Sequence, residues 1–571
     1  MATGKDMDFE TIMREGIHPK LSAAPDAPGR FPGTPPCPPP ERAVSRENGL
    51  LIERNLAVTL RDGIKILIDL YRPDGAAGER DLPALVGWSP YGKHNLSDRL
   101  WPAAEVNEGW ISKYTGFEAP DPLYWCQHGY AIILPDPRGS WYSEGEMHHG
   151  GVVEAQDCYD LIEWAGTQPW SNGKVGMSGV SYLTCIQYQV APLKPPHLAA
   201  INPWEGFSDW YREFGYHGGM RDTGFIPRSA TRLGWSTTRT EDTPANMQAH
   251  PLYDAYWKSK ENDLAGIEVP AFVVASWSDH GLHTRGTLEA FKKISSRHKW
   301  LEVHGQKKWY YYYRPDNVEK QRRFFDRFLK GADNDVLSWP RVNLEVRERA
   351  WVGKFRTEKE WPLARTQYRK LFLDASCAAL SPDPATKESE IRYDPLNYGY
   401  ASFTHTFPED TELTGHMKLH LWVETDVADD MDLFVAVQKL DSAGQFVPFV
   451  FYATYDNGPV ALGWLRASHR ELDPVLSTPQ QPVHPHTREQ RLTPGVPVPL
   501  EIEIWPSSTL FRAGEKLRVL VKGRDIYPDA SAGPATMRHE DLRNRGAHIL
   551  RTGGRYDAYL LVPVIPPPQS S

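Results

Sequence analysis

The 571-residue sequence has few cysteines, no long apolar run and no block of basic charge. It contains five cysteines and no CxxC pair, which argues against a disulfide framework or a thiolate zinc site; they are Cys37, Cys126, Cys158, Cys185 and Cys377. No uninterrupted apolar stretch reaches the roughly 18 residues that a membrane-spanning helix needs. The net charge of -9 is mild for this length. A membrane protein and a nucleic-acid partner are therefore both poor interpretations.

The N-terminal stretch MATGKDMDFETIMREGIHPK also lacks the basic-then-apolar pattern of a secretory signal. A cytoplasmic location is the resulting expectation, although a processed chain could have lost a leader. The length exceeds what one hydrophobic core supports, so about two to four domains are expected.

Composition and periodicity divide the chain into five segments. Residues 1–46 form a Pro-rich N-terminal arm, because proline favours extended chain over regular helix or central strand. Residues 47–203 open with two antiparallel strands joined by the turn RDG. From residue 84 to 203, and again over 269–337, short apolar runs alternate with helical periodicity, which indicates a largely parallel, doubly wound sheet. Residues 204–268 interrupt that alternation with an aromatic-rich, helical insertion expected to cover one end of the sheet. Residues 338–571 change to period two, which predicts an all-β sandwich or jelly roll.

The stretch GKVGMSGVSYLTC offers two serines as nucleophiles, Ser178 and Ser181. A nucleophile elbow places its serine in a sharp strand-to-helix turn, with small residues where the turn is crowded. Ser178 ends the predicted strand, whereas Ser181 lies in the turn and has Gly179 two residues before it. The strict G-x-S-x-G pattern fails because Leu183 replaces the second glycine. Spacing alone leaves a plain strand-to-helix turn as an equal alternative.

A serine nucleophile needs a base within hydrogen-bond reach and an acid that orients the base. In α/β hydrolases the order along the chain is serine, acid, histidine. Asp279 follows the predicted strand AFVVASW and His304 ends the predicted strand KWLEVH, so both groups occur in that order. An Asp after a strand can also be a turn residue, and a strand-end His can be structural.

Several longer motifs resemble a known family. The phrases GxVGMxGxSY, PDPRGSWYSEGE, SWSDxxxxxRGTLEAF and QRRFFDRFLKG are similar to the acyl hydrolases grouped with cocaine esterase and the catalytic part of X-prolyl dipeptidyl peptidases. The resemblance covers most of the chain, including FRAGEKLRVLV near its C-terminal end. It implies an α/β-hydrolase domain with a helical lid and a C-terminal jelly roll.

The resemblance also implies roles for individual residues. Ser181 would be the nucleophile and Asp279 the orienting acid. The oxyanion hole would combine the backbone N–H of Tyr182 with the phenolic O–H of Tyr91, because a tetrahedral intermediate needs preorganised donors. No metal or organic cofactor is implied.

Two positions depart from the family pattern. Thr184 stands where the family commonly has glycine. The family histidine usually lies in a Gly-Pro-Trp-x-His phrase after the last strand, but this chain reads VHGQKKW and a gap-free match places Trp309 at that histidine. His304 is then the preferred base, and His280, His283 and His94 are the alternatives.

Other interpretations stay open at this point. The DHGLH run (residues 279–283), with His148 and His149, offers carboxylate and imidazole ligands for a metal, and the acidic run at residues 429–432 offers oxygens for calcium, although neither spacing is standard. A catalytically degenerate hydrolase that binds through its β-domain is a further alternative.

The substrate expected for an active enzyme is a small-molecule ester, or an amide. Phe207, Trp210 and Trp309 could line an apolar acyl pocket, although core packing explains such aromatics equally well. An X-prolyl or aminoacyl peptidase is the alternative, but no carboxylate cluster for a substrate's α-amino group is identifiable. A homo-oligomer is possible, since the Pro-rich arm could wrap a neighbouring subunit as easily as its own.

Overall fold

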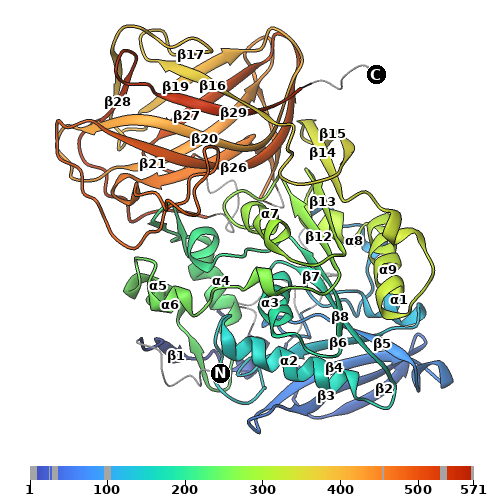
Figure 1. Cartoon of the computed structure of the whole chain (residues 1–571). Coiled ribbons are helices and arrows are strands. Elements are labelled where there is room, and N and C mark those ends of the chain that lie inside the picture. The colour runs from blue at the N-terminus through green and yellow to red at the C-terminus, as the bar shows by residue number, and fades with distance from the viewer. Residues whose placement is uncertain are drawn as a thin grey trace.

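The computed structural model describes residues 9–24, 26–28, 36–95, 104–452, 455–526 and 537–566. Figure 1 shows two parts: a sheet with helices on its faces, and an all-β part formed by the C-terminal third of the chain. Residues 1–8, 25 and 29–35 of the Pro-rich arm lie outside the described residues.

The central sheet runs from one antiparallel edge to another through a parallel middle. Its strands pair in the order β2, β3, β4, β6, β5, β7, β8, β12, β13, β14, β15. Each pairing between β6 and β14 is parallel, as βαβ connections require, whereas β4–β6 and β14–β15 are antiparallel. Their bounds are β2 (Ala43–Glu47), β3 (Leu50–Thr59), β4 (Lys65–Pro73), β5 (Leu82–Val86), β6 (Ala131–Asp136), β7 (Ser171–Val180), β8 (Leu198–Trp204), β12 (Ala271–Ser276), β13 (Lys299–His304), β14 (Val342–Arg349) and β15 (Val352–Glu358).

Helices cover both faces of this sheet, so its middle strands are apolar on both sides. One buried cluster joins the sheet to α2 (Val152–Gly166), α3 (Tyr182–Val190) and α7 (Thr284–Lys293). A second joins the opposite face to α1 (Pro122–Gln127), α8 (Lys308–Tyr313) and α9 (Pro315–Leu329). Strands and helices alternate from β5 to β8 and from β12 to α9, as the periodicity predicts, and the antiparallel pair predicted before them is β3 and β4.

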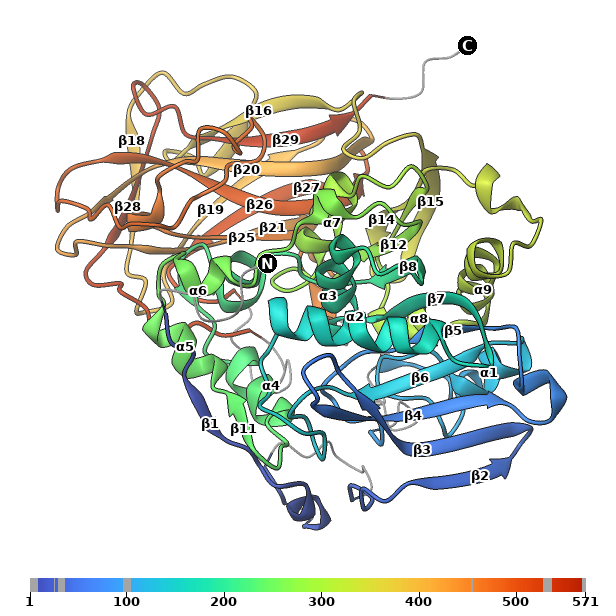
Figure 2. The same cartoon turned by 60° about the horizontal axis from the view of Figure 1, so that its bottom comes forward.

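The segment between β8 and β12 is less helical than expected. It combines short strands with short helices: the π-helix Trp210–Gly215, β9 (Tyr216–His217), β10 (Met220–Arg221), α4 (Phe225–Leu233), β11 (Arg239–Glu241), α5 (Thr243–Ala249) and α6 (Ala255–Lys258). Near the N-terminus, β1 (Met13–Glu15) pairs with β11, so this part of the arm lies on its own chain (Figure 2).

The C-terminal part consists of two runs of paired strands around one buried cluster. One run is β16-β29-β20-β26, with β18-β28 beside β20, and the other is β17-β19-β27-β21-β25. The bounds are β16 (Gln367–Asp374), β17 (Ala379–Ser381), β18 (Ser389–Tyr393), β19 (Tyr400–Thr406), β20 (Thr411–Thr425), β21 (Asp432–Leu440), β22 (Phe446–Val447), β23 (Phe449–Phe451), β24 (Tyr455–Gly458), β25 (Ala461–Arg466), β26 (Val498–Phe511), β27 (Lys516–Lys522), β28 (His548–Thr552) and β29 (Tyr559–Ile565). The central sheet continues past the expected boundary at residue 338, because β14 pairs in parallel with β13.

Candidate active site

Ser181 occupies a strained turn between β7 and α3. Its backbone has φ 61° and ψ -116°, in a region that L-residues rarely adopt. A Cβ added to Gly179 would lie 2.4 Å from the Leu183 side chain, so only glycine fits there. Tyr182 is the first residue of α3, and helix geometry gives its N–H no partner within the helix. The turn thus presents a serine hydroxyl beside an amide donor, as a nucleophile elbow requires.

Thr184, at the position of the family glycine, is accommodated by a glycine across the turn. A Cβ on Gly206 would lie 2.3 Å from the Thr184 methyl group. The Thr184 hydroxyl also accepts a hydrogen bond from the Trp204 N–H at 2.7 Å. Thr184 therefore ties α3 to the end of β8 and leaves the backbone turn at Ser181 intact.

His283 and Asp279 meet Ser181 from the loop that joins β12 to α7. The Ser181 Oγ lies 3.1 Å from His283 Nε2, and His283 Nδ1 lies 2.5 Å from Asp279 Oδ2. The loop curls tightly enough that the N–H groups of His283 and Thr284 both donate to the Asp279 carbonyl, at 3.1 and 3.2 Å. This curl places the two side chains, four residues apart, in contact.

His304, the base preferred from the sequence, lies elsewhere. Its Nε2 is 3.0 Å from Glu205 Oε1, and its Nδ1 accepts from the Gln306 N–H at 3.2 Å. The ring also stacks on Tyr311 at a centroid distance of 3.8 Å. With both nitrogens engaged, His304 has no free lone pair to accept a proton from Ser181. The geometry therefore brings His283, and not His304, to the serine.

The two other candidate histidines have different neighbours. His280 Nδ1 accepts from the Leu462 N–H at 3.2 Å, and the His94 ring packs edge-on against Trp141 at 4.2 Å. Ser178 is buried and hydrogen-bonds to Asn202 at 3.1 Å, which is a structural arrangement within the sheet.

Lys308 is a cation that the sequence reasoning missed. Its Nζ lies 3.2 Å from Asp279 Oδ2 and 3.3 Å from His283 Nδ1. Burial disfavours the Asp279 carboxylate, but Lys308 and His283 together hold its pKa below the ordinary value. Burial and the Lys308 charge, opposed by Asp279, lower the pKa of His283 to about 4. His283 is therefore neutral at pH 7, with its Nε2 lone pair directed at the serine.

Tyr91 and Glu118 lie on the other side of Ser181. Tyr91 forms side-chain hydrogen bonds with Ser181 and with Glu118. Burial, reinforced by the Glu118 charge, raises the pKa of Tyr91 well above its ordinary value, so the phenol keeps its proton. Trp309, at the family histidine position, donates from Nε1 to Glu118 Oε1 at 2.8 Å. Trp309 thus positions Glu118, which in turn hydrogen-bonds to Tyr91.

The predicted aromatic residues of the insertion lie beside this site. Phe207 is parallel to the His283 ring at 6.3 Å, and it meets Trp210 edge-on at 4.8 Å. Trp210 in turn lies 6.4 Å from Tyr182. All three aromatic side chains are buried.

The site is built without a recognisable metal cluster. Among the residues that the structure describes, no group of three or more His, Cys, Asp or Glu side chains could hold a metal ion. In the acidic run at residues 429–432, Asp430 and Asp432 are paired with arginines, through Arg543 and Arg466 at 3.0 and 2.6 Å. No helix of the described chain is long and apolar enough to cross a membrane. All five cysteines are free thiols.

Comparison with known proteins places this geometry in a family. A solved structure from Staphylococcus aureus, described as a CocE/NonD family hydrolase, is 40% identical, superposes with a TM-score of 0.87, and matches over 90% of this chain and 94% of that one. The chain belongs to the CocE/NonD family of hydrolases. The predicted resemblance to this group, and the prediction of a hydrolase with a mixed α/β fold, are therefore confirmed.

Two family models match separate parts of this CocE/NonD hydrolase. One, described as X-Pro dipeptidyl-peptidase (S15 family), matches residues 62–248, and the other, described as X-Pro dipeptidyl-peptidase C-terminal non-catalytic domain, matches residues 334–561. Cocaine esterase from Rhodococcus sp. (strain MB1 Bresler) is 28% identical over 395 residues, which are 57% of this chain and 63% of that protein. A putative Xaa-Pro dipeptidyl-peptidase from Bacillus anthracis is 21% identical over 525 residues, with 81% of each chain covered. The relatives of the chain are thus named as both esterases and peptidases.

Proposed function

We propose that this CocE/NonD hydrolase is a serine-dependent carboxylic ester hydrolase that cleaves a small-molecule ester, or an amide, through an acyl-enzyme on Ser181. The observation that carries the proposal is the hydrogen-bonded series from Ser181 Oγ through both nitrogens of His283 to Asp279. Such a series activates a hydroxyl that is otherwise a weak nucleophile. His283 replaces His304 as the proposed base.

Each neighbour of Ser181 has a part in the proposed reaction. His283 Nε2 takes the Ser181 proton as Oγ attacks the ester carbonyl, and Asp279 holds the imidazolium that forms. The Tyr182 N–H and the Tyr91 O–H donate to the oxyanion. His283 then returns the proton to the departing alcohol, which leaves the acyl group on Ser181. Water, deprotonated by His283, attacks the acyl carbonyl. His283 then gives this proton to Ser181 Oγ as the carboxylic acid leaves, which restores the free enzyme.

The substrate and the architecture around the site belong to the same proposal. Phe207 and Trp210 would contact the acyl group, since they lie beside His283 and Tyr182. Trp309 would act indirectly, through Glu118. Residues 204–268 would form the lid, the strands from β16 onward a jelly roll, and no cofactor would take part. The cytoplasmic location and a homo-oligomer stay predictions.

A peptidase is the second candidate. The names of the two matching family models and of the Bacillus anthracis relative favour hydrolysis of a peptide bond after proline. The same acyl-enzyme chemistry serves both substrates, so a panel of p-nitrophenyl esters and X-prolyl p-nitroanilides separates them by kcat/KM. A catalytically degenerate protein would turn over neither.

The experiment that tests Ser181 is intact-mass analysis after treatment with a fluorophosphonate. We expect one adduct on the wild type and on Ser178→Ala, the matched control, and none on Ser181→Ala. An adduct that persists on Ser181→Ala would overturn the assignment of the nucleophile. No adduct on folded wild type would favour the degenerate protein.

A further inference from the structure

A series of three hydrogen bonds leads from the C-terminal part to the loop that carries Asp279 and His283. Asp525 Oδ1 lies 2.8 Å from His539 Nδ1, and His539 Nε2 lies 2.9 Å from His217 Nδ1. His217 Nε2 then lies 2.6 Å from the carbonyl oxygen of Gly281. Gly281 is midway between Asp279 and His283, so the series ends within the loop.

The number of protons in this series follows from its two ends. The carboxylate of Asp525 and the carbonyl of Gly281 are both acceptors, and four imidazole nitrogens lie between them. Three hydrogen bonds need three protons, but two neutral imidazoles carry only two. If the third proton is lost, two lone pairs face each other at one of the three links. The intact series therefore carries one proton more than two neutral histidines and a carboxylate.

The surrounding charges place that proton on His539. Burial opposes the charge, but the carboxylates of Asp525, Asp222 and Asp432 raise the pKa of His539 above its ordinary value. Burial and the neighbouring His539 lower the pKa of His217 to about 3. A cationic His539 then donates to both Asp525 and His217, and a neutral His217 donates to Gly281.

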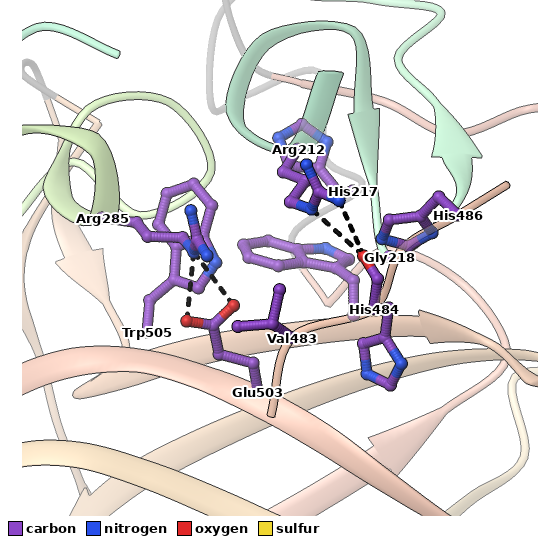
Figure 3. A pocket seen from close by; sticks show the side chains of 10 residues that line it. Arg212, His217, Gly218, Arg285, Val483, His484, His486, Glu503 and Trp505 are labelled. Atoms are coloured by element: carbon purple, nitrogen blue, oxygen red, sulfur yellow. Dashed lines mark hydrogen bonds and ion pairs between the residues drawn. The ribbon is translucent and has the colours of Figure 1, made fainter. Parts of the chain in front are cut away.

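The groups packed around His217 are otherwise aromatic or already paired. Figure 3 shows His217 at a small cavity, about 30 Å³, between the insertion and the C-terminal strands. The charged residues of this cavity are paired: Arg285 with Glu503, which lines the same cavity, at 2.9 Å, and Arg212 with Asp209 at 2.7 Å. The Trp464 ring lies 5.1 Å from His217. The carboxylates that act on the series therefore raise the pKa of His539, whereas no carboxylate is among the groups that shift the pKa of His217.

The loop that receives this series has little internal freedom. Gly281 has φ 96°, and a Cβ there would lie 2.1 Å from the Met537 methyl group, two residues before His539. The Tyr452 N–H also donates to the Ser278 carbonyl at 2.7 Å. The C-terminal part thus contacts the loop on both sides of Asp279.

We propose that Asp525, His539 and His217 form a proton-dependent brace that positions the 279–283 loop, and with it His283, against Ser181. The three are positioning residues, and the proposal rests on the function proposed above for Ser181 and His283. Loss of one proton from the brace breaks one hydrogen bond and loosens the loop.

The brace predicts an alkaline limit to activity. His283 must be neutral, so activity rises with pH through about 4. The brace holds while His539 is cationic, so activity falls as the pH rises through the pKa of His539, above 6.5. Tyr91 and Lys308 titrate above their ordinary values near 10 and do not set this limb.

The test measures the rate of fluorophosphonate labelling of Ser181 as a function of pH in three variants. Asp525→Asn removes the carboxylate that favours cationic His539, so the alkaline limb should move down by about one pH unit or more. The rate at pH 8, relative to that at pH 6, should then fall about tenfold. His539→Gln keeps an N–H donor without a titrating proton, so the limb should disappear while the rate near pH 6 is retained. Asp541→Asn is the matched control, because Asp541 pairs with Arg221 at 2.9 Å on the same segment.

Hydrogen–deuterium exchange of a peptide spanning residues 278–284 gives a readout that does not depend on catalysis. Corrected for the intrinsic rate, exchange should rise between pH 6 and 9 in the wild type and stay constant in His539→Gln. Two results would overturn the brace. One is an alkaline limb of the labelling rate at the same pH in the wild type, Asp525→Asn and His539→Gln, and the other is loop exchange that rises equally with pH in all three. A wild type that shows the expected exchange of the loop but no labelling by the fluorophosphonate is a separate outcome. That result would overturn the proposal that Ser181 is a nucleophile and would support the brace.

Discussion

Two neighbouring strand ends each place a buried histidine beside a carboxylate, and they differ in what the second ring nitrogen does. At the end of β13, His304 donates to Glu205 and accepts from the Gln306 backbone. After β12, His283 is bonded to Asp279 through Nδ1 and directs Nε2 at Ser181. Burial and a carboxylate partner therefore do not identify a catalytic histidine. The free lone pair does, because a base must have a vacant site for the proton.

The most direct way to break this comparison is to remove each histidine in turn. His283→Ala should lower kcat/KM by about 10⁴-fold or more, since it removes the imidazole that accepts the Ser181 proton. His304→Ala should change kcat/KM less than about tenfold, but it should destabilise the fold by about 1–3 kcal/mol because Glu205 loses its partner. Ester hydrolysis and thermal unfolding of both variants give the two numbers. A larger kinetic loss in His304→Ala than in His283→Ala would restore His304 as the base.

A second prediction separates the two tyrosines at the elbow. Tyr91→Phe should lower kcat by about 10²–10³-fold, because a preorganised oxyanion donor is lost. Tyr182→Phe is the control: its backbone N–H stays, and its hydroxyl donates to Glu154 at 2.7 Å, away from the reacting carbonyl. Equal losses of kcat in the two variants would show that Tyr91 is not a specific donor.

A smaller effect is expected on the pH dependence of activity when the charge of Lys308, beside His283, is removed. Lys308→Met removes a positive charge that lowers the pKa of His283, so that pKa should rise from about 4 towards 6.5. His283 acts in its neutral form, so the acidic limb of kcat/KM should move up in pH. The ratio of kcat/KM at pH 5 to that at pH 8 should fall about 3–10-fold.

Lys307→Met is the matched control for this pH profile. Lys307 is buried like its neighbour, but it pairs with Glu105 and Asp456, at 2.9 and 3.1 Å. The acidic limb of Lys307→Met should stay where it is in the wild type. An acidic limb in Lys308→Met that equals that of the wild type would mean that the ammonium does not act on His283.

The sequence predicted those features that depend on neighbours in the chain. Strands and helices of the central sheet follow from apolar periodicity, and the turn at Ser181 follows from the strand, Gly179 and helix around it. Asp279 follows from its position directly after β12. The choice between His283 and His304 depends on how a five-residue loop curls, which periodicity does not reveal. The DHGLH spacing indicates that a carboxylate and imidazoles lie close together, which makes His283 an alternative base as well as a possible metal ligand, but spacing alone does not favour it over His304.

The remaining differences arise from long-range contacts. Lys308 lies 29 positions after Asp279, and the fold of α8 brings the two together. The course of β14 depends on its pairing with β13, although its period-two pattern matches the strands of the C-terminal part equally well. The insertion is rich in aromatic residues, which pack in short strands and in the π-helix Trp210–Gly215 as readily as in regular α-helices.

The acid and the base of the proposed catalytic group come from one stretch of five residues. A shift of this stretch would move both side chains together and keep their mutual distance, so its alignment with Ser181 reduces to a single rigid-body placement. The segment after β13 then supplies no group that transfers a proton. Insertions or deletions in it should leave the reaction intact as long as the positions of Lys308 and Trp309 are kept.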